Sequence, residues 1–487
     1  MFFINNKPFH IYTLLLCTAV LSSCGGGGGS SSNPDTDSDG IVNSVDVDDD
    51  NDGLIEIASL QQLDWIRYDL AGTSLTDNNG NVDSSGCPVG GCNGYELVAD
   101  LDFDTNGNNI ADAGDTYYDY DGDGSNNGWL PIGRLLGTAF AANFNGNGYV
   151  IRNLYVNRIA GDAETNGDYS SLFGRVYTIG SITIQNLILE GADITGQTST
   201  GILAGAVDAN SGGSVTIHNC RVDGSVAGNN HTGGLIAYAL TNSILTNNVS
   251  LATVTGTGGL YTGGLIGRID ELFGNQGAII NGSYATGDVT GSDRVGGLIG
   301  QVNDSNTDFK VQINNSFATG SVMVTGDYIG GLIGLSYQLD LSDSFATGSV
   351  SGNRFVGGLV GDANQQSTIT NSFATSIVTG NQDVGALVGW SDGASYTSTY
   401  MASGRGATNA IGTNNSGGGV NPTGTTMATL SELQCPITAD DTGCVGGTTM
   451  YSGWSSSNWD FGSNAQLPGL IINSTVYRDG DGNGVLD

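Results

Sequence analysis

The residues best suited to chemistry are carboxylates at alternate positions near the start of the chain. They lie in two consecutive runs, each containing a glycine at position 40 or 53. Alternate carboxylates in a loop converge on one centre, and Ca²⁺ accepts six to eight such oxygen ligands in flexible geometry. The sequence therefore predicts that residues 35–56 bind Ca²⁺, the alternative being a solvated acidic linker. The predicted ligands are Asp35, Asp37, Asp39, Asp46, Asp48, Asp50 and Asp52.

This double run resembles the thrombospondin type-3 calcium repeats over residues 35–53. It departs from that pattern at Asn43, which is a weaker ligand than aspartate. The resemblance implies calcium as a structural cofactor of the segment.

Three shorter clusters have related spacing. One resembles the start of an EF-hand loop but lacks the glutamate at the twelfth position. A second is shorter, and the third ends the chain. Each predicts either a Ca²⁺ site or a polar turn, and removal of Ca²⁺ is expected to lower the melting temperature because unpaired carboxylates repel one another. The clusters are Asp102, Asp104 and Asn106; Asp119, Asp121 and Asp123; and Asp479, Asp481 and Asn483.

Charge and composition narrow the class of protein. The chain has 48 acidic against 13 basic side chains and a formal charge of −35. Nucleic acid and anionic membrane surfaces are poor partners for such an acidic chain, since phosphate binding needs clustered Lys and Arg. With 80 glycines in 487 residues, a helical architecture is disfavoured, whereas 38% apolar residues are ample for a core.

An internal repeat gives the strongest structural signal. Gly-Gly-Leu-Ile-Gly or a variant recurs with a period of about 30 residues. A second element, Asn-Ser-Phe-Ala-Thr-Gly at residues 315–320, recurs at 343–348 and 371–376 with small changes. Neighbouring aliphatics alternate with period two, which predicts short strands. The repeated leucine falls at Leu172, Leu203, Leu235, Leu265, Leu298, Leu332, Leu359 and Leu387.

No single repeat can bury its apolar side alone, so the units must stack with like residues above like. The fold class predicted is all-β: a parallel β-helix (β-solenoid) of eight or more coils of about 30 residues each. An acidic calcium-binding segment precedes the coils. Residues 425–475 break the period and contain Trp454 and Trp459, which predicts a C-terminal cap covering the last coil.

The Gly-Gly-Leu-Ile-Gly copies resemble GLUG motifs, which occur in large bacterial surface proteins and adhesins. Residues 95–103, 129–133 and 144–154 resemble the opening coils of such proteins, so the likeness covers most of residues 54–470. It implies adhesion or biofilm formation through binding of extracellular glycans or surface proteins.

The N-terminus has the pattern of an export signal. Lys7 precedes an apolar stretch at 11–21 that is too short to span a bilayer core of about 30 Å. Leu-Ser-Ser-Cys at 21–24 resembles the lipobox of bacterial lipoproteins. That resemblance implies cleavage before Cys24, a lipid anchor on its thiol, and an outer membrane lipoprotein at the cell surface. The alternative is an ordinary secretory signal with an incidental cysteine.

The resulting division of the chain has six parts. They are 1–23 lipoprotein signal peptide, 24–34 Gly/Ser tether, 35–56 acidic calcium-binding repeats, 57–164 N-terminal cap and first coils, 165–400 GLUG-type solenoid repeats, and 401–487 C-terminal cap with a terminal Asp-rich loop.

The remaining cysteines predict two local disulfides, as expected for an exported protein. Cys87 pairs with Cys92, and Cys435 with Cys444; zinc is the alternative, but no histidine lies nearby. Cys220 occupies the repeat position of later serines and is expected to be a small buried residue.

Candidates for catalysis are few. Gly-Trp-Ser-Asp-Gly at 389–393 has the form of a nucleophile elbow, but no histidine follows it in the chain. A polysaccharide-cleaving β-helix, acting through paired aspartates, is the main alternative to a binding protein. Ice binding by the repeated Thr286, Thr319, Thr347 and Thr375 is a third. The coil aspartates are scattered rather than clustered: Asp288, Asp304, Asp308, Asp340 and Asp362.

Overall fold

The computed structural model describes residues 35–487 except 40, 135–137, 160–166, 211, 241, 272–276, 305–309, 365, 416 and 464. The predicted signal peptide, Cys24 and the tether at 24–34 lie outside the described residues. Within the described part of the chain, no helix is long and apolar enough to cross a membrane.

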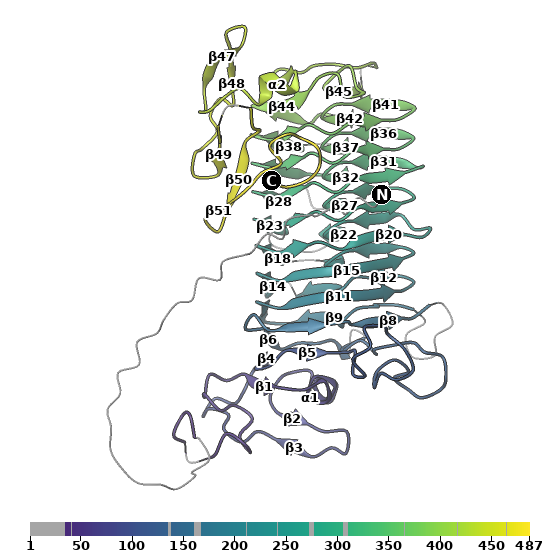
Figure 1. Ribbon diagram of the computed structural model, residues 1–487, viewed down its shortest axis with the longest axis vertical. Helices are drawn as coiled ribbons and strands as arrows, with labels where there is room; N and C mark the ends of the chain where they lie inside the picture. The colour runs from purple at the N-terminus through teal and green to yellow at the C-terminus, as the bar shows by residue number, and fades with distance from the viewer. Residues whose placement is uncertain are drawn as a thin grey trace, which may run out of the picture.

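Parallel strands from successive coils stack into a rod (Figure 1). The fold is an all-β parallel β-solenoid of about seven turns, with coils of about 31 residues and little helix. This confirms the predicted fold class. The turns number about seven, against the eight or more expected; beside the seven-stranded sheet, the first repeat copy contributes only an isolated bridge, Ser170 to Thr200.

Three long sheets form three faces of the rod. The eleven-stranded sheet contains β1 (Ile55–Ile57), β4 (Gly94–Leu97), β6 (Asn143–Asn145), β10 (Ser181–Gln185), β14 (Ser214–His218), β18 (Ser243–Thr246), β23 (Ile279–Asn281), β28 (Val311–Asn314), β33 (Leu339–Ser342), β38 (Thr368–Thr370) and β43 (Ser395–Thr397). The nine-stranded sheet contains β9 (Phe173–Thr178), β13 (Ala204–Ala209), β17 (Ile236–Ala239), β22 (Ile266–Glu271), β27 (Ile299–Asp304), β32 (Ile333–Ser336), β37 (Val360–Ala363), β42 (Val388–Ser391) and β45 (Ile411–Asn414). The seven-stranded sheet contains β12 (Ser199–Thr200), β16 (His231–Gly233), β21 (Tyr261–Gly263), β26 (Val295–Gly296), β31 (Asp327–Gly330), β36 (Arg354–Gly357) and β41 (Gln382–Gly385).

On the fourth face most coils contribute two short strands. These are β5 (Leu101–Asp102), β7 (Val150–Arg152), β8 (Tyr155–Asn157), β11 (Ile188–Thr195), β15 (Arg221–Gly228), β19 (Val249–Ser250), β20 (Thr253–Gly256), β24 (Tyr284–Ala285), β25 (Val289–Gly291), β29 (Phe317–Ala318), β30 (Val322–Val324), β34 (Phe345–Ala346), β35 (Val350–Ser351), β39 (Phe373–Ala374), β40 (Val378–Thr379), β44 (Thr399–Ala402) and β46 (Thr425–Ala428).

The terminal segments add short antiparallel pairs and helices. They are α1 (Leu60–Trp65), a 3₁₀ turn (Ile66–Tyr68), β2 (Leu75–Thr76), β3 (Val82–Asp83), α2 (Leu430–Leu433), β47 (Asp441–Val445), β48 (Thr448–Met450), β49 (Trp459–Asp460), β50 (Gly469–Ile472) and β51 (Thr475–Tyr477).

The repeated leucines form a continuous ladder through the core. All eight are fully buried, and the backbone N–H of Leu265 donates to Leu298 O at 2.9 Å, as Leu298 does to Leu332. The glycines beside them allow the coils to approach. A Cβ atom on Gly297 would lie 2.2 Å from the carbonyl oxygen of Gly331. The motif glycines are therefore packing residues, as the repeat pattern indicated.

The repeated aromatics also stack, but outside the main core. Phe317 lies 4.5 Å from Tyr284 and 4.7 Å from Phe345, with nearly parallel rings. They belong to a second apolar cluster shared with the C-terminal segment. Trp459 packs 5.8 Å from Phe373. This column of rings, Tyr284, Phe317, Phe345 and Phe373, is called the aromatic ladder below.

The C-terminal segment contacts the last coil, as predicted, where β46 pairs with β44 and Trp454 Nε1 donates to Ser398 O at 3.0 Å. It then continues along the flank of the rod, which the sequence did not predict. Figure 1 shows β49–β51, in yellow, beside the middle coils rather than beyond the last one. Trp459 Nε1 donates to Asp343 Oδ1 at 2.9 Å. The physical reason is the outward direction of the aromatic ladder, which needs an apolar cover along several coils.

The recurring threonines are buried under this segment. Thr319 and Thr347 are 2% exposed, and Thr375 is fully buried. Arg405 Nη1 donates to both Thr375 O and Gly482 O, at 2.7 and 2.8 Å, and so joins the coils to the last loop. Three of the four threonines are therefore not available to an ice surface.

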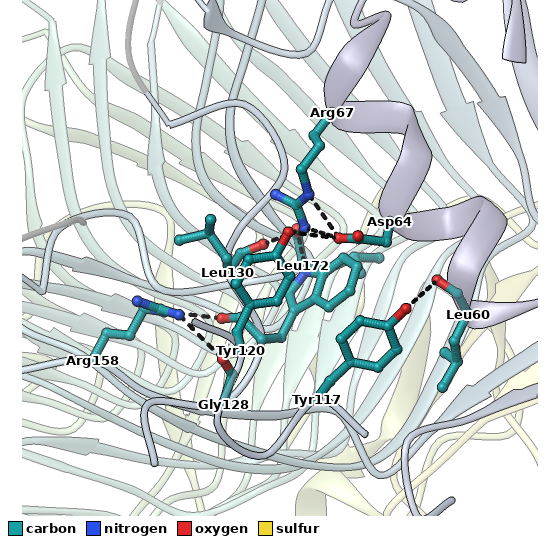
Figure 2. Close-up of polar contacts among 10 residues, drawn as sticks. Leu60, Asp64, Arg67, Tyr117, Tyr120, Gly128, Leu130, Arg158 and Leu172 are labelled. Atoms are coloured by element: carbon teal, nitrogen blue, oxygen red, sulfur yellow. Dashed lines mark hydrogen bonds and ion pairs between the residues drawn. The ribbon is translucent and has the colours of Figure 1, made fainter. Parts of the chain in front are cut away.

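At the other end, side-chain contacts join the N-terminal cap to the first coil (Figure 2). Arg67, just after α1, pairs with Asp64 at 2.6 Å, and its guanidinium lies 4.9 Å from the ring centroids of both Tyr120 and Trp129. Trp129 is fully buried and its Nε1 donates to Leu172 O at 3.3 Å. The cap is thereby held against the start of the leucine ladder.

Truncation of the aromatic ladder should destabilise the protein strongly. Phe345 is fully buried between two rings, so Phe345→Ala is expected to lower the free energy of unfolding by about 3–5 kcal/mol. Urea denaturation measures the change. Met323→Ala is the control, because Met323 is 52% exposed and should change stability by less than about 0.5 kcal/mol. Equal effects of the two substitutions would contradict the buried ladder.

Candidate calcium centre

Five carboxylates from three segments converge where the acidic run meets the rod. Oxygen atoms of Asp48, Asp50 and Glu56 lie within 4.8 Å of one another, and so do those of Asp50, Asp52 and Glu96. The two trios share Asp50. We call these five residues the cap cluster.

Local structure explains this convergence. Glu56 on β1 and Glu96 on β4 are direct partners in the parallel ladder, with core residues on either side of each. The acidic loop leads straight into β1. Within that loop, the Asp48 carboxylate accepts hydrogen bonds from the N–H groups of Asp52 and Gly53, at 3.1 and 3.0 Å. Gly53 has a φ of 88°, which only glycine adopts readily.

The cap cluster is partly removed from water. Asp48 is fully buried and Glu96 is 5% exposed. Glu56 Oε2 is buried and has no hydrogen-bond partner among the described residues. Burial raises the pKa of Asp48 to about 6, of Glu96 to about 7 and of Glu56 to about 9, with smaller contributions from neighbouring carboxylates. These all-oxygen donors fit a hard divalent cation, which would supply the missing partner.

Sequence reasoning missed two of these five carboxylates. Glu56 lies at the ninth position of a loop that begins at Asp48, a spacing that could have identified it. Glu96 has no local signal, because only the β1–β4 pairing brings it to the loop.

The first acidic run forms a separate cluster. Carboxylate oxygens of Asp35, Asp37 and Asp39 lie within 4.8 Å of one another. Burial raises the pKa of Asp46, with further contributions from Asp39 and Asp37. Asn43 instead spans the two runs, since its Nδ2 donates to Asp49 Oδ2 at 2.7 Å.

The loop after β5 has the same turn as the loop that begins at Asp48. It begins at Asp104, two residues later than the sequence predicted. Asp104, rather than Asp102, accepts from N–H groups four and five residues ahead, those of Asn108 and Asn109, at 3.0 and 2.7 Å. Asn109 has a φ of 62° and so replaces the expected glycine. Asp102 lies on β5 and accepts from Asn153 Nδ2 at 2.8 Å.

In this register the other predicted ligand, Asn106, occupies the third position of the loop. Its Nδ2 donates to Asp112 Oδ1 at 2.9 Å. Asp115 falls at the twelfth position, where the predicted register had no acid, and is 9% exposed. The loop therefore has more carboxylates than the sequence pattern indicated.

The last loop repeats this turn a third time. Asp479 accepts from the N–H groups of Asn483 and Gly484, at 3.0 and 2.7 Å, and is 1% exposed. Burial raises its pKa. Asp481 accepts from Asn483 Nδ2 at 2.8 Å. The short cluster of Asp119, Asp121 and Asp123 also has its oxygens within 4.8 Å of one another.

Both predicted cysteine pairs are disulfide-bonded in the structure. The Cα atoms are 5.2 Å apart in Cys87–Cys92 and 5.7 Å apart in Cys435–Cys444. Cys92 Sγ lies 3.4 Å from Asp48 Oδ2, so the first bond borders the cap cluster. Cys220 is free and buried.

The residues considered for catalysis are dispersed or engaged. Ser391 is 5% exposed and accepts from the Tyr396 hydroxyl at 2.8 Å. Asp340, on the eleven-stranded sheet, pairs with Lys310 at 2.8 Å, whereas Asp362 lies on the nine-stranded sheet. Asp308 and the side chain of Asp304 lie outside the described residues. Asp340 and Asp362 therefore lie on different faces of the rod.

Without metal, the stability of the cap cluster should fall as pH rises. The folded-state pKa values of Glu56 and Glu96 are above the ordinary 4.5, so their protonated forms stabilise the fold fully below about pH 4.5. That stability is lost as pH rises through about 7 and 9. Melting temperatures in excess chelator should therefore decline from pH 4.5 to 9.5, and less steeply in Glu96→Gln. A flat or rising profile in chelator would contradict this.

Calcium should raise the melting temperature through the cap cluster. Occupancy at a hundred times Kd would add about 2.7 kcal/mol to the free energy of unfolding. Glu56→Gln should reduce the Ca²⁺-dependent increase, measured by calorimetry with calcium and with excess chelator. Glu190→Gln is the matched control, because Glu190 pairs with Arg221 on the rod. An equal increase in Glu56→Gln and in the unmodified chain would rule out the cap cluster.

Comparison with known proteins gives distant likenesses. No protein-family model matches the chain. Over 156 residues, 32% of this chain, it is 33% identical to halomucin of Haloquadratum walsbyi, of which it spans 1%. A putative immunoglobulin A1 protease from Bacteroides ovatus is similar at 17% identity and a TM-score of 0.37, over 83% of this chain and 93% of that one. An IgA1 protease is similar at 19% identity and a TM-score of 0.30, over 65% of this chain and 20% of that one.

Proposed function

We propose that this chain is a lipid-anchored, calcium-stabilised β-solenoid that acts in adhesion or biofilm formation at a bacterial surface. The observation that carries the proposal is the cap cluster, in which Glu56 and Glu96 of the first coils meet the acidic loop. A calcium ion there would tie the segment nearest the tether to the rod. The rod would then project from the envelope as one stiff body.

Two sequence resemblances support a location at the bacterial surface. GLUG-like copies, such as residues 263–267 and 296–300, are typical of bacterial surface proteins and adhesins, and the lipobox-like residues 21–24 precede a Gly/Ser tether. A lipid on Cys24 would place the acidic repeats next to the membrane and the coils beyond them. The chain carries a formal charge of −35, which favours cations over nucleic acid as partners.

The side chains of the rod are better suited to binding than to catalysis. A rod binds through many weak contacts along its length, and repetition multiplies their effect. The extracellular partners expected are glycans or surface proteins. Ligation of Ca²⁺ by carboxylates supports the architecture and needs no catalytic group.

The test uses the chain from Gly25 onward, with calcium, on a panel of immobilised polysaccharides and surface-protein extracts. Retention without cleavage is expected. Retention by none of them would contradict adhesion through these partners. Release of reducing or unsaturated ends would replace the proposal with a polysaccharide-cleaving enzyme.

A further inference from the structure

Two rows of side chains run along the rod where the nine-stranded and seven-stranded sheets adjoin. Each row has one member per coil. On the nine-stranded sheet, successive Cα partners are Tyr238, Arg268, Gln301, Leu335, Asp362 and Trp390. The neighbouring row is His231, Tyr261, Arg294, Tyr328 and Phe355. We call the two rows together the arginine–aromatic face.

Ring stacking joins the two rows. His231 lies 4.6 Å from Tyr238 and 5.1 Å from Tyr261, with nearly parallel rings. The Arg294 guanidinium lies between Tyr261 and Tyr328, at 5.5 and 5.3 Å. Because neighbours cover the ring faces, a ligand would meet ring edges and polar groups here. The stack fixes those groups in position along the rod axis.

Several polar atoms of this face lack partners among the described residues. They are Gln301 Oε1, Asp362 Oδ1, Arg268 Nε and both ring nitrogens of His231. The side chains of Gln301 and Asp362 are each only 5% exposed. A buried polar group without a hydrogen-bond partner destabilises a fold. A ligand would satisfy such groups on several coils if the side chains that cover them turn aside as it binds.

The chemistry of the face identifies the ligand class. It has donors, in Arg294 and in Arg268 Nε, and acceptors, in Gln301 and Asp362; Arg268 Nη2 already pairs with Asp270 at 2.8 Å. Arg294 contacts two rings and has no carboxylate partner in the described chain. Hydroxyl groups satisfy donors and acceptors alike. One position per coil, about 4.8 Å apart, suits an extended chain of repeating units.

Charge disfavours charged polymers as ligands of this face. The net charge of −35 repels polyanions over long range, while at the face itself Asp270 and Asp362 balance the charges of Arg268 and Arg294. We propose that the arginine–aromatic face binds a neutral polysaccharide laid along the rod axis. This rests on the proposed adhesive function and assigns a site to it.

Gln301→Leu tests the assignment, because the next coil carries Leu335 at the same position. Removing a buried acceptor without a partner should raise the melting temperature, whereas the affinity for polysaccharide should fall about tenfold. A purely structural residue would not change the two in opposite directions. Gln312→Leu is the matched control, since Gln312 is exposed on the eleven-stranded sheet and should leave affinity unchanged.

The probes are dextran, xylan and mannan as neutral chains and polygalacturonate as an acidic one, with affinity measured by gel retardation. Weaker binding of a neutral chain by Gln301→Leu alone supports the site. Undiminished binding by Gln301→Leu overturns the site but leaves adhesion standing. Binding of polygalacturonate alone, or of surface protein alone, overturns the neutral ligand class. Failure of the unmodified chain to bind any partner overturns both proposals.

Discussion

The structure depends on one constraint: every coil must place its residues in register above those of the coil below. Parallel stacking at about 4.8 Å leaves no room to shift a side chain by one position without turning it to the other side of the sheet. The leucine ladder satisfies this constraint inside the rod and the aromatic ladder satisfies it outside. Glycines at the corners, such as Gly297, let neighbouring backbones approach closely enough for the ladders to form.

The ends of such a stack have no neighbouring coil and need other contacts. At the N-terminal end, Arg67 and Trp129 join the cap to the first coil, while the cap cluster brings carboxylates of the loop and of β1 and β4 together. Burial of like charges is unfavourable there unless protons or a cation balance them. The same residues therefore link the architecture of the cap to the ionic conditions around it.

Much of this fold was predictable from the sequence, because the repeat period directly reports the stacking. The leucine spacing predicted the core ladder, and the two disulfides followed from short cysteine separations. The sequence did not predict whether the repeated aromatics point into the rod or away from it. Phenylalanine is common in protein cores, yet Phe317 and Phe345 lie outside the main core. They are buried there because the C-terminal segment covers them.

The candidate site was predictable only where its ligands are local. Asp48, Asp50 and Asp52 lie in one motif, but Glu96 reaches it through strand pairing. The register of the loop at 104–115 was missed because Asn109 adopts the positive φ expected of glycine. Side-chain amides tolerate that conformation, so a missing glycine does not exclude the turn.

The flanking position of the C-terminal segment has a consequence for how such a rod can evolve. Trp459 reaches back to Asp343, and Arg405 joins Thr375 to the final loop. Inserting or deleting one coil between those points would move each anchor by a full step along the axis and detach the segment. In the described chain, the apolar cluster of that segment reaches back only as far as Val249 and Leu251. Duplication could therefore lengthen the rod in its first half, whereas its second half has a fixed number of coils.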